Sequence, residues 1–533
     1  MNVFHDSGNS EPSIQMMKVI PFLKKHKAAC VIFALSLGLG FAVFGDYGIA
    51  WDEPLQRLIG QYSFDYVIKG HKTLNEFHDR DYGVAVELPL IFLEQTYLKH
   101  DTHDIYRMRH FTIHLFFLLS AFAFYLLIWI LYRNKPLAVC GYLMLLLSPR
   151  IYAQSFFNSK DIPFMCMFIL CFLVCAIAFR DKKIRHFVLF GILSGLLINI
   201  RIMGIVIPAV VTVLVLIDIF MGPYRKRILM LYGVYLVLTV VVVILTWPWL
   251  WEDPAGRFQI AFSNMSKFRW DNNILMNGDF VKASAVGWKY LPQWFGLTTP
   301  VIYLLLGIAG FVFFVLRFFR KPLDFIRQTN DRNQLIYLVC SAGPVMAVII
   351  LHSVLYDGWR QMYFIYPAFL LLAVYGLSSL INARIFFGDL PKVAISILLI
   401  VSFAGTGFTM IKSHPFEDVY FNILLSKKDQ YLRKTFELDY WGTSYKQALE
   451  YIVARDRSPV LKIKVANLPG EYNSYILKPE DRKRIQYVEA DDQADYFITD
   501  YRWHPWDYPY PKEKKIFSIT IQNSEICSAW KLH

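Results

Sequence analysis

The sequence is short of charge. Asp, Glu, Lys and Arg make up only 18% of its 533 residues, whereas soluble domains carry about a quarter. Hydrophobic residues make up 56% of the chain, and the mean hydropathy is +0.37. Several apolar runs reach the ~20 residues that a helix needs to cross a bilayer. This composition excludes an ordinary soluble protein and predicts a polytopic membrane protein.

Paired cysteines are also lacking. Six of the seven cysteines lie in apolar runs, and Cys527 alone lies in a polar region, where it has no obvious disulfide partner. No CxxC pair and no Cys/His spacing typical of a metal site occurs. Internal repeats and low-complexity segments are not evident. The pattern therefore favours neither a disulfide framework nor a zinc site.

The net charge of +13 does not indicate nucleic-acid binding. Basic residues cluster in short connectors between apolar runs, such as Arg180 to His186 and Pro223 to Arg227. This is how the positive-inside rule for membrane proteins appears in a sequence. No basic stripe with base-reading motifs is present, so the charge reports topology.

Hydropathy predicts about eleven spans. Their ranges are near 28–45, 111–132, 136–150, 162–179, 187–200, 203–221, 229–247, 299–318, 334–355, 362–381 and 392–411. The third and fifth are short of a full crossing, which leaves a re-entrant helix as an alternative for either.

Loop charge predicts that residues 1–27 form a cytoplasmic N-terminal segment. With the N-terminus inside, every cytoplasmic connector is short and basic, as the positive-inside rule requires. The opposite connectors, including outer loops 46–110 and 248–298, are longer or mixed in sign and rich in Trp and Tyr. Aromatic residues are enriched at membrane interfaces. The fold class is therefore a mainly α, polytopic transmembrane helical bundle over 28–411, with its N-terminus inside.

The composition changes to a soluble pattern near Lys412. Residues 443–456 have helical periodicity, and residues 460–468, 494–501 and 515–522 have the pattern of strands. We expect residues 412–533 to form a small extracytoplasmic α/β domain.

Polar residues at the membrane edge gather on one side of this topology. Charged side chains within a membrane are costly and tend to mark pathways or sites. The set comprises Asp46, Asp52 and Glu53 in the first outer loop, Arg150, Lys160 and Asp161 before span four, Asn199 and Arg201 between spans five and six, and His352, Asp357 and Arg360 between spans nine and ten.

Several of these residues have simpler explanations. Asp52-Glu53-Pro54 is a good helix start, with Asp as N-cap and Pro near the first turn. Lys160 and Arg150 can each snorkel to the interface, and His352 fits an interface histidine. Arg201 is harder to explain in this way, because apolar residues flank it and no acid is near it in the sequence.

The combination indicates one reaction type. Arg and Lys can hold the phosphate of a lipid-linked sugar. A carboxylate can take the proton of an acceptor hydroxyl as it attacks the anomeric carbon. Fixed cations can stabilise the departing polyprenyl phosphate.

Four motifs carry a resemblance to a known family. They are WDEP (51–54), FFNSKDIPF (156–164), NIRIMGIVIP (199–208) and YDGWRQMYFIYP (356–367). In their order and topology they resemble the GT-C superfamily of membrane glycosyltransferases. The branch most similar contains protein O-mannosyltransferases and the lipid A aminoarabinose transferase. The resemblance implies a GT-C-type catalytic domain over 28–411.

The resemblance also implies roles for residues. The transfer would be inverting, with Asp52 as base and Glu53 supporting it or contacting the acceptor. Asp161 would position the acceptor, or a metal if one is used; no cofactor is required. The implied donor-phosphate ligands are Lys160, Arg201 and Arg360, and the candidates for acceptor contacts are Arg150, His352 and Asp357.

The implied partners are a polyprenyl-phosphate sugar and an envelope glycan or lipid acceptor, at the outer face of a bacterial inner membrane. A WWDYG-type acceptor motif is missing, and DYWG at 439–442 is only a superficial echo of it. Two other functions stay open. One is a transporter or flippase for a lipid-linked or anionic substrate, although no repeat symmetry supports it. The other is a membrane-anchored interaction protein, which would leave the acids of the first loop unexplained.

Overall fold

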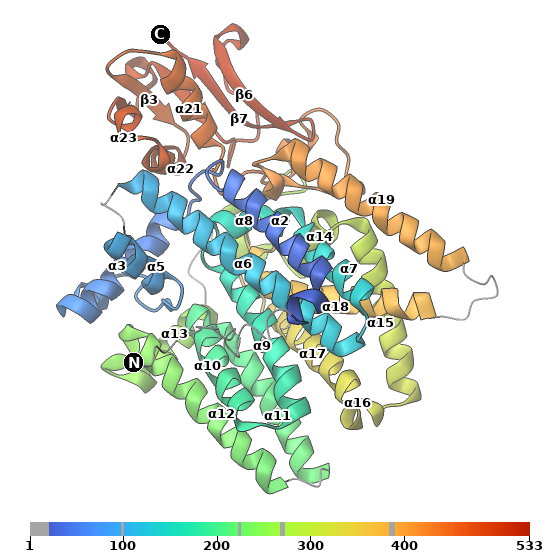
Figure 1. The fold of residues 1–533 in the computed structure, drawn as a ribbon. Coiled ribbons are helices and arrows are strands. Elements are labelled where there is room, and N and C mark those ends of the chain that lie inside the picture. The colour runs from blue at the N-terminus through green and yellow to red at the C-terminus, as the bar shows by residue number, and fades with distance from the viewer. Residues whose placement is uncertain (1–20, 98–100, 222–224, 267–271, 383–389) are drawn as a thin grey trace, which may run out of the picture.

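The computed structural model describes residues 21–97, 101–221, 225–266, 272–382 and 390–533. Most of the predicted cytoplasmic segment 1–27 lies outside this part of the chain. Helices of the apolar region form the body of the molecule, and a sheet domain caps one end (Figure 1).

Among the described residues, eight helical segments are long and apolar enough to cross a membrane. They are α6 (Thr102–Tyr132), α9 (Asp161–Asp181), η1 (Ile202–Ile205) with α11 (Val206–Met221), α12 (Arg225–Thr246), α15 (Val301–Arg320), α17 (Thr329–Ile350), η4 (Arg360–Ile365) with α18 (Tyr366–Asn382), and α19 (Leu390–Ser413). Two shorter apolar helices, α2 (Lys27–Val43) and α10 (Ile184–Ile200), coincide with the first and fifth predicted spans.

The third predicted span, 136–150, is wrong as a single helix. It is replaced by α7 (Lys135–Leu146) and α8 (Pro149–Phe157), which are bent by 63° relative to one another. The break has a local cause, because Pro149 disfavours a helical conformation at Ser148 and lacks an N–H donor. Ser148 adopts φ −102° and ψ 98°, and its hydroxyl donates to the Met144 carbonyl at 2.7 Å. The bend turns α8 into a fully buried helix at one end of the bundle.

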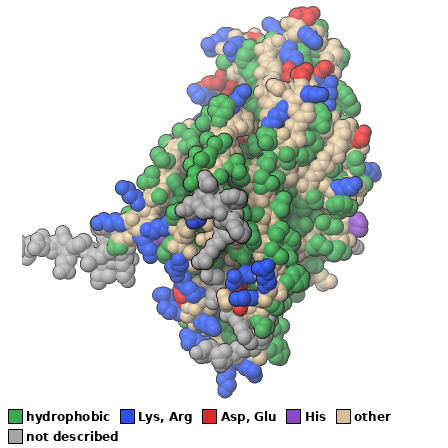
Figure 2. Space-filling model, turned by 90° about the vertical axis from the view of Figure 1, so that its right-hand side faces the viewer, with side chains coloured by type: hydrophobic (Ala, Val, Ile, Leu, Met, Phe, Trp, Pro, Cys, Tyr) green, Lys and Arg blue, Asp and Glu red, His purple; other side chains and the backbone are tan. Residues whose placement is uncertain are grey.

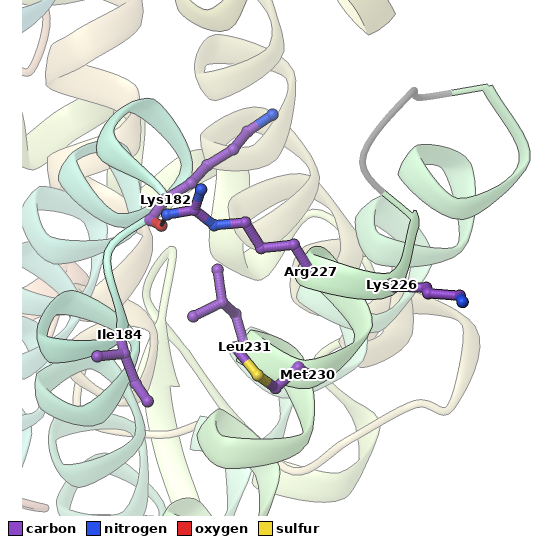
Figure 3. A pocket seen from close by; sticks show the side chains of 6 residues that line it. All are labelled: Lys182, Ile184, Lys226, Arg227, Met230 and Leu231. Carbon is purple, nitrogen blue, oxygen red and sulfur yellow. Dashed lines mark hydrogen bonds between the residues drawn. The ribbon is translucent and has the colours of Figure 1, made fainter.

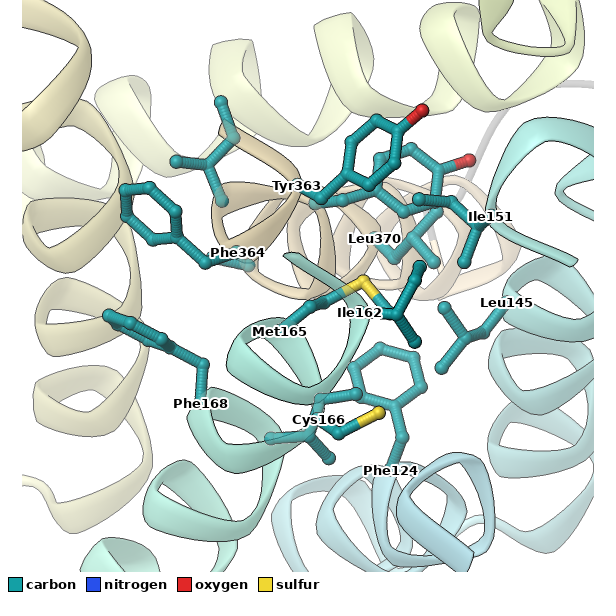
Figure 4. Close-up of a cluster of buried hydrophobic side chains, with 14 of the residues drawn as sticks. Phe124, Leu145, Ile151, Ile162, Met165, Cys166, Phe168, Tyr363, Phe364 and Leu370 are labelled. Atoms are coloured by element: carbon teal, nitrogen blue, oxygen red, sulfur yellow. The ribbon is translucent and has the colours of Figure 1, made fainter. Parts of the chain in front are cut away.

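Helix α9 is the centre of the bundle, and 83% of its most apolar stretch is buried. It packs between α6 and α10 and against η4. Met165, Cys166 and Phe168 point into a cluster with Phe124 of α6 and Phe364 of η4 (Figure 4). The Phe168 and Phe364 ring centroids lie 4.9 Å apart. This packing fixes both the start of α9 and η4, which carry the site described below.

Outer helices expose their apolar side chains instead. Only 17% of the most apolar stretch of α19 is buried, and Ile400 and Ile411 are exposed. Hydrophobic side chains cover much of the middle of the face in Figure 2, while Lys and Arg lie toward its lower end and, mixed with Asp and Glu, at its upper end. A surface of this kind suits lipid, and the chain is an integral membrane protein.

The C-terminal domain holds a five-stranded sheet in the order β4-β3-β5-β7-β6. Strand β3 (Leu461–Val465) is parallel to β4 (Ile485–Tyr487) and β5 (Tyr496–Thr499), and β7 (Ser524–Lys531) is antiparallel to β5 and β6 (Lys515–Ile521). Helix α21 (Tyr445–Arg455) packs on β5, β6 and β7. The predicted α/β pattern is confirmed, although β4 and β7 were not expected.

The remaining elements connect these two parts. The segment between α2 and α6 contains α3 (Glu53–Lys69), α4 (Thr73–Glu76) and α5 (Glu87–Tyr97). The segment between α12 and α15 contains α13 (Pro254–Ser266), β1 (Asn273–Met276), β2 (Asp279–Lys282) and α14 (Tyr290–Thr298). Short helices α16 (Asp324–Arg327), α20 (Tyr431–Thr435), α22 (Pro469–Tyr472) and α23 (Pro479–Arg482) complete the order.

The C-terminal domain pins the chain just before α3. Asn473 binds the backbone of Ile49 twice, through Oδ1 to its N–H at 2.8 Å and through Nδ2 to its carbonyl at 3.0 Å. The Trp51 N–H donates to the Trp441 carbonyl at 3.0 Å. Gly48 passes so close that a Cβ there would lie 2.1 Å from the Thr443 carbonyl oxygen. Only glycine fits this position, so the segment that leads into α3 has one place to lie.

A histidine marks the junction after α19. His414 lies 2.9 Å from Glu417 and 3.0 Å from Asp46. Burial lowers its pKa, but the hydrogen bonds to Glu417 and Asp46 outweigh that effect and raise it overall.

The raised pKa of His414 makes its contribution to stability depend on pH. The contribution is fully present below the pKa of about 6.5 that histidine has in the unfolded chain, and it is lost as pH rises through the higher pKa of the folded protein. We expect His414→Gln to destabilise the protein by about 1 kcal/mol or less at pH 5.5 and by less at pH 8.5, as measured by unfolding at both pH values.

Candidate active site

Five charged side chains meet where the bundle faces the C-terminal domain. We call them the carboxylate–arginine cluster: Asp52, Asp161, Arg201, Asp357 and Arg360. They come from four separate segments, namely the start of α3, the start of α9, the turn between α10 and η1, and the turn before η4. Bringing opposite charges together offsets the cost of placing each near the membrane.

Arg360 is the hub of the cluster. Its Nη1 donates to Asp52 Oδ2 at 3.1 Å and to Asp161 Oδ2 at 3.2 Å. Its Nη2 donates to Asp357 Oδ2 at 3.1 Å. Arg201 closes the other side through an ion pair of 2.5 Å to Asp161 Oδ1. Two guanidinium groups thus face three carboxylates.

Asp52 is the carboxylate of the cluster that solvent can reach. Its side chain is 34% exposed, against 1% for Asp161 and 5% for Asp357. Asp52 occupies the N-cap position of α3, but its carboxylate makes no capping hydrogen bond. The helix-cap explanation therefore accounts for its place in the chain and not for where its side chain points.

Glu53 points away from the cluster. Its Oε2 accepts from the Ala50 N–H at 2.8 Å, and its Oε1 lies 3.1 Å from His110 Nε2 on α6. The side chain is buried, and its contacts fasten the start of α3 to the bundle. This position suits support of the helix that carries Asp52 rather than contact with an acceptor.

Lys160 lies beside the cluster, at the N-cap position of α9. Its Nζ sits 3.4 Å from the ring centroid of Tyr82. Burial, with the positive charge of Arg201 nearby, lowers the pKa of Lys160 to about 7. A negative group entering the site would favour its charged form.

The loop before α9 is braced by buried polar contacts. Asn158 Oδ1 accepts from the Asp161 N–H at 2.8 Å, and Asn158 Nδ2 donates to Asp161 Oδ2 at 3.1 Å. The Ser159 hydroxyl donates to Glu87 Oε1 at 2.5 Å. Glu87 is in turn paired with Arg109 of α6. This bracing fixes the carboxylate of Asp161 before anything binds.

Arg109 is fully buried and also donates to Glu94 at 2.9 Å. Removing one partner of a buried ion pair leaves an uncompensated charge. We expect Arg109→Met to lower the free energy of unfolding by about 3–5 kcal/mol. Arg57→Met is the control, because Arg57 binds the same Glu94 at 2.9 Å but is 19% exposed. Thermal unfolding of both variants in one detergent checks the expectation, and equal losses would contradict it.

Four residues singled out from the sequence lie apart from the cluster. Arg150 is buried and donates to the Tyr420 carbonyl at 3.0 Å. His352 is exposed at the end of α17 and takes no part in the contacts above. Asn199 Oδ1 accepts from the Val84 N–H at 2.8 Å, which ties the segment between α2 and α6 to α10. Asp46 is paired with His414, as described for the junction after α19.

The structure adds residues that the sequence patterns did not indicate. Arg502 of the C-terminal domain donates to Asp357 Oδ1 at 2.8 Å. The Trp441 ring centroid lies 4.5 Å from the Arg360 guanidinium carbon. Gln154 Nε2 donates to the Tyr440 hydroxyl at 3.0 Å. Tyr440 and Trp441 belong to the DYWG stretch, so that stretch lies at the site even though its letters differ from the WWDYG pattern.

A cavity lies between the end of α9 and the start of α12 (Figure 3), at the end of the bundle away from the C-terminal domain (Figure 1). Arg227 and Lys182 border it, and Arg227 Nη2 donates to the Lys182 carbonyl at 3.0 Å. Helix α10 separates this cavity from Arg201, since the cavity is near its first residue, Ile184, and Arg201 follows its last. This cavity therefore does not belong to the carboxylate–arginine cluster.

The arrangement around Asp161 does not suit a metal ion. Its two oxygens face Arg201 and Arg360, whose charges would repel a cation. Within the described residues, no group of three or more His, Cys, Asp or Glu side chains is placed to hold a metal.

Comparison with known proteins gives one family match. Residues 97–249 match the family described as dolichyl-phosphate-mannose-protein mannosyltransferase. The matched part contains Lys160, Asp161 and Arg201. The match confirms the resemblance to membrane glycosyltransferases. Among curated proteins, none is similar enough in sequence to count as a relative.

Matches to solved structures extend over most of the chain. ArnT from Cupriavidus metallidurans in the apo state has 11% sequence identity and a TM-score of 0.49, covering 94% of this chain and 98% of its own. The same protein bound to undecaprenyl phosphate has 12% identity and a TM-score of 0.46, covering 94% and 97%. The archaeal oligosaccharyltransferase AglB from Archaeoglobus fulgidus, in complex with an inhibitory peptide and a dolichol-phosphate, has 11% identity and a TM-score of 0.48, covering 90% and 70%.

Proposed function

We propose that this chain is a membrane glycosyltransferase that moves a sugar from a polyprenyl-phosphate donor to an acceptor hydroxyl, with inversion. The observation that carries the proposal is the geometry around Asp52. Its carboxylate is partly exposed and paired with Arg360, and Arg201 and Lys160 lie beside this pair. The family match over residues 97–249 supports the same reaction type. The proposed acceptor is an envelope glycan or lipid, met at the outer face of a bacterial inner membrane.

The cations would hold the donor by its phosphate. Arg201 is 19% exposed and Arg360 only 4%, so Arg201 is the first of the two arginines to meet an incoming phosphate. Guanidinium groups bind phosphate oxygens in a fixed geometry, and a lysine adds a point charge. Phosphate binding would favour the charged form of Lys160, whose pKa of about 7 leaves it partly neutral beforehand.

Asp52 would act as the general base. It accepts the proton of the acceptor hydroxyl while the hydroxyl oxygen forms a bond to the anomeric carbon. The bond from that carbon to the phosphate oxygen breaks, and its electron pair leaves with the polyprenyl phosphate. Arg201, Arg360 and Lys160 would stabilise the charge that develops on this leaving group. Attack opposite to the departing oxygen inverts the configuration.

The proposed reaction needs no metal, because the two arginines and the lysine supply positive charge at the leaving group. Asp161 and Asp357 then serve to hold those arginines. Each carboxylate restricts the rotamers of an arginine side chain, so these side chains lose little conformational entropy when the donor binds.

A panel of polyprenyl-phosphate sugars tests the proposal. Purified protein in liposomes is given each donor with envelope glycan and lipid acceptors, and glycosylated product and released polyprenyl phosphate are measured. We expect equal amounts of both with one donor class. Movement of a lipid-linked donor across the bilayer without transfer would favour a flippase instead. Donors supplied to one leaflet at a time test the proposed side of reaction.

A further inference from the structure

Arg502 connects the C-terminal domain to the carboxylate–arginine cluster. Its side chain is 5% exposed, and besides Asp357 it binds the carbonyl of Tyr440. Its guanidinium carbon lies 4.9 Å from the Trp51 ring centroid and 4.8 Å from that of Trp503. The side chain is therefore held on four sides, one of which is the residue directly before Asp52.

The loop that carries Arg502 has an unusual backbone. Tyr501 and Trp503, on either side of it, adopt φ of +60° and +61°. Bulky residues rarely occupy this left-handed region, and such strain persists only where surrounding contacts impose it. Thr499 Oγ1 accepts from the Tyr501 N–H at 2.9 Å, and Asp500 Oδ1 accepts from the Arg502 N–H at 3.1 Å. These contacts fix a conformation whose visible result is the insertion of Arg502 into the cluster.

Asp357 is shared between two arginines, with one oxygen facing each. Oδ1 accepts from Arg502 at 2.8 Å, and Oδ2 accepts from Arg360 at 3.1 Å. Without Arg502, both oxygens of Asp357 would be left to Arg360 alone. A two-point pair with Asp357 would then compete with the contacts that Arg360 makes to Asp52 and Asp161.

We propose that Arg502 is a positioning residue of the active site, which acts through Asp357 to hold Arg360 against Asp52 and Asp161. The assignment rests on the proposed function, since Arg360 would bind the donor phosphate and Asp52 would be the base. The active site is then completed by a domain outside the bundle.

The variants that test this role are Arg502→Gln, Arg502→Lys and a matched control. Arg484→Gln is the control, because Arg484 is also a structural arginine of the C-terminal domain but donates to the carbonyls of Val453, Asp456 and Ser458, away from Asp357. We expect kcat/KM for transfer to fall about 10–100-fold in Arg502→Gln, because small misplacements of catalytic groups have effects of this size. Arg502→Lys should recover part of the loss. Arg484→Gln should keep kcat/KM within about twofold of wild type. Its thermal midpoint should fall at least as far as that of Arg502→Gln.

A double-mutant cycle with Asp357→Asn separates positioning from general stability. If Arg502 acts through Asp357, adding Arg502→Gln to Asp357→Asn should lower kcat/KM by less than about threefold more. The proposal is overturned if Arg502→Gln lowers kcat/KM by the same factor in wild type and in Asp357→Asn. It is also overturned if Arg502→Gln and Arg484→Gln are equally active. No transfer by wild type with any donor would overturn the proposed function instead. In that event the same cycle is read by thermal unfolding, where additive shifts would refute the link between Arg502 and Asp357.

Discussion

Asp52→Asn is expected to lower the rate of sugar transfer by about 10²–10⁴-fold, the contribution typical of a general base. The amide keeps the shape of the side chain and can still accept from Arg360 Nη1, so the variant should fold. It cannot take the proton of an acceptor hydroxyl. Single-turnover transfer with a saturating donor measures the loss directly, and polyprenyl phosphate binding should change by less than about tenfold.

Asp46→Asn is the matched control for this prediction. Asp46 lies six residues earlier in the same loop and also bears a carboxylate, but its partner is His414 and its side chain is 52% exposed. We expect its transfer rate to stay within about twofold of wild type, as for most exposed sites. Full activity in Asp52→Asn would remove Asp52 as the base. Equal losses in both variants would point to a general effect of the loop.

Arg360→Gln is expected to weaken polyprenyl phosphate binding at least tenfold and to destabilise the protein by about 3–5 kcal/mol. The loss of stability arises because Arg360 is 4% exposed and faces three carboxylates. In this variant Asp161 still pairs with Arg201, and Asp357 still pairs with Arg502. Asp52 loses its only ion-pair partner among the described residues. Ligand-induced shifts of the thermal midpoint with undecaprenyl phosphate measure both effects together.

Arg332→Gln separates the two effects. Arg332 makes a two-point pair with Asp218, at 2.6 and 2.9 Å, near the first turn of α17 and far along that helix from the cluster. Arg332→Gln should lower the thermal midpoint of the free protein while leaving the shift caused by undecaprenyl phosphate unchanged. A variant Arg360→Lys should bind phosphate better than Arg360→Gln, because it keeps the charge without the two-point geometry. Unchanged phosphate binding in Arg360→Gln would show that this arginine does not hold the donor.

The membrane part of the fold could be predicted from the sequence because its signal is local. Each apolar run reports its own burial in lipid, so all eleven predicted segments coincide with apolar helices or with the bent pair. The break at Ser148 escaped hydropathy, which averages over a window and does not register one proline. Strand β4 has only three residues and a mixed burial pattern, too little for an alternation to be visible.

The candidate site was predictable only in part. Asp52, Asp161, Arg201 and Arg360 stand out because each is a charge at a membrane edge, and topology alone puts them on one side. Glu53 looks the same in the sequence, yet its direction is set by His110, 57 residues away. Arg502 lies in the polar C-terminal domain, where charged residues are common and a single arginine gives no sequence signal of a site. Its role depends on a contact across 145 positions, which no local pattern contains.

The two hydrogen bonds between Asn473 and the backbone of Ile49 join residues separated by 424 positions. During synthesis, Asp52 leaves the ribosome long before the segment that fixes the backbone beside it. At 5–20 residues per second, roughly 20–85 s separate the two. Until the C-terminal domain has folded, the backbone beside Asp52, the proposed base, lacks the hydrogen bonds that fix it in the complete protein. The proposed role of Asp52 therefore makes transfer depend on the segment around Asn473, and a chain that ends before Asn473 is expected to lack transfer activity.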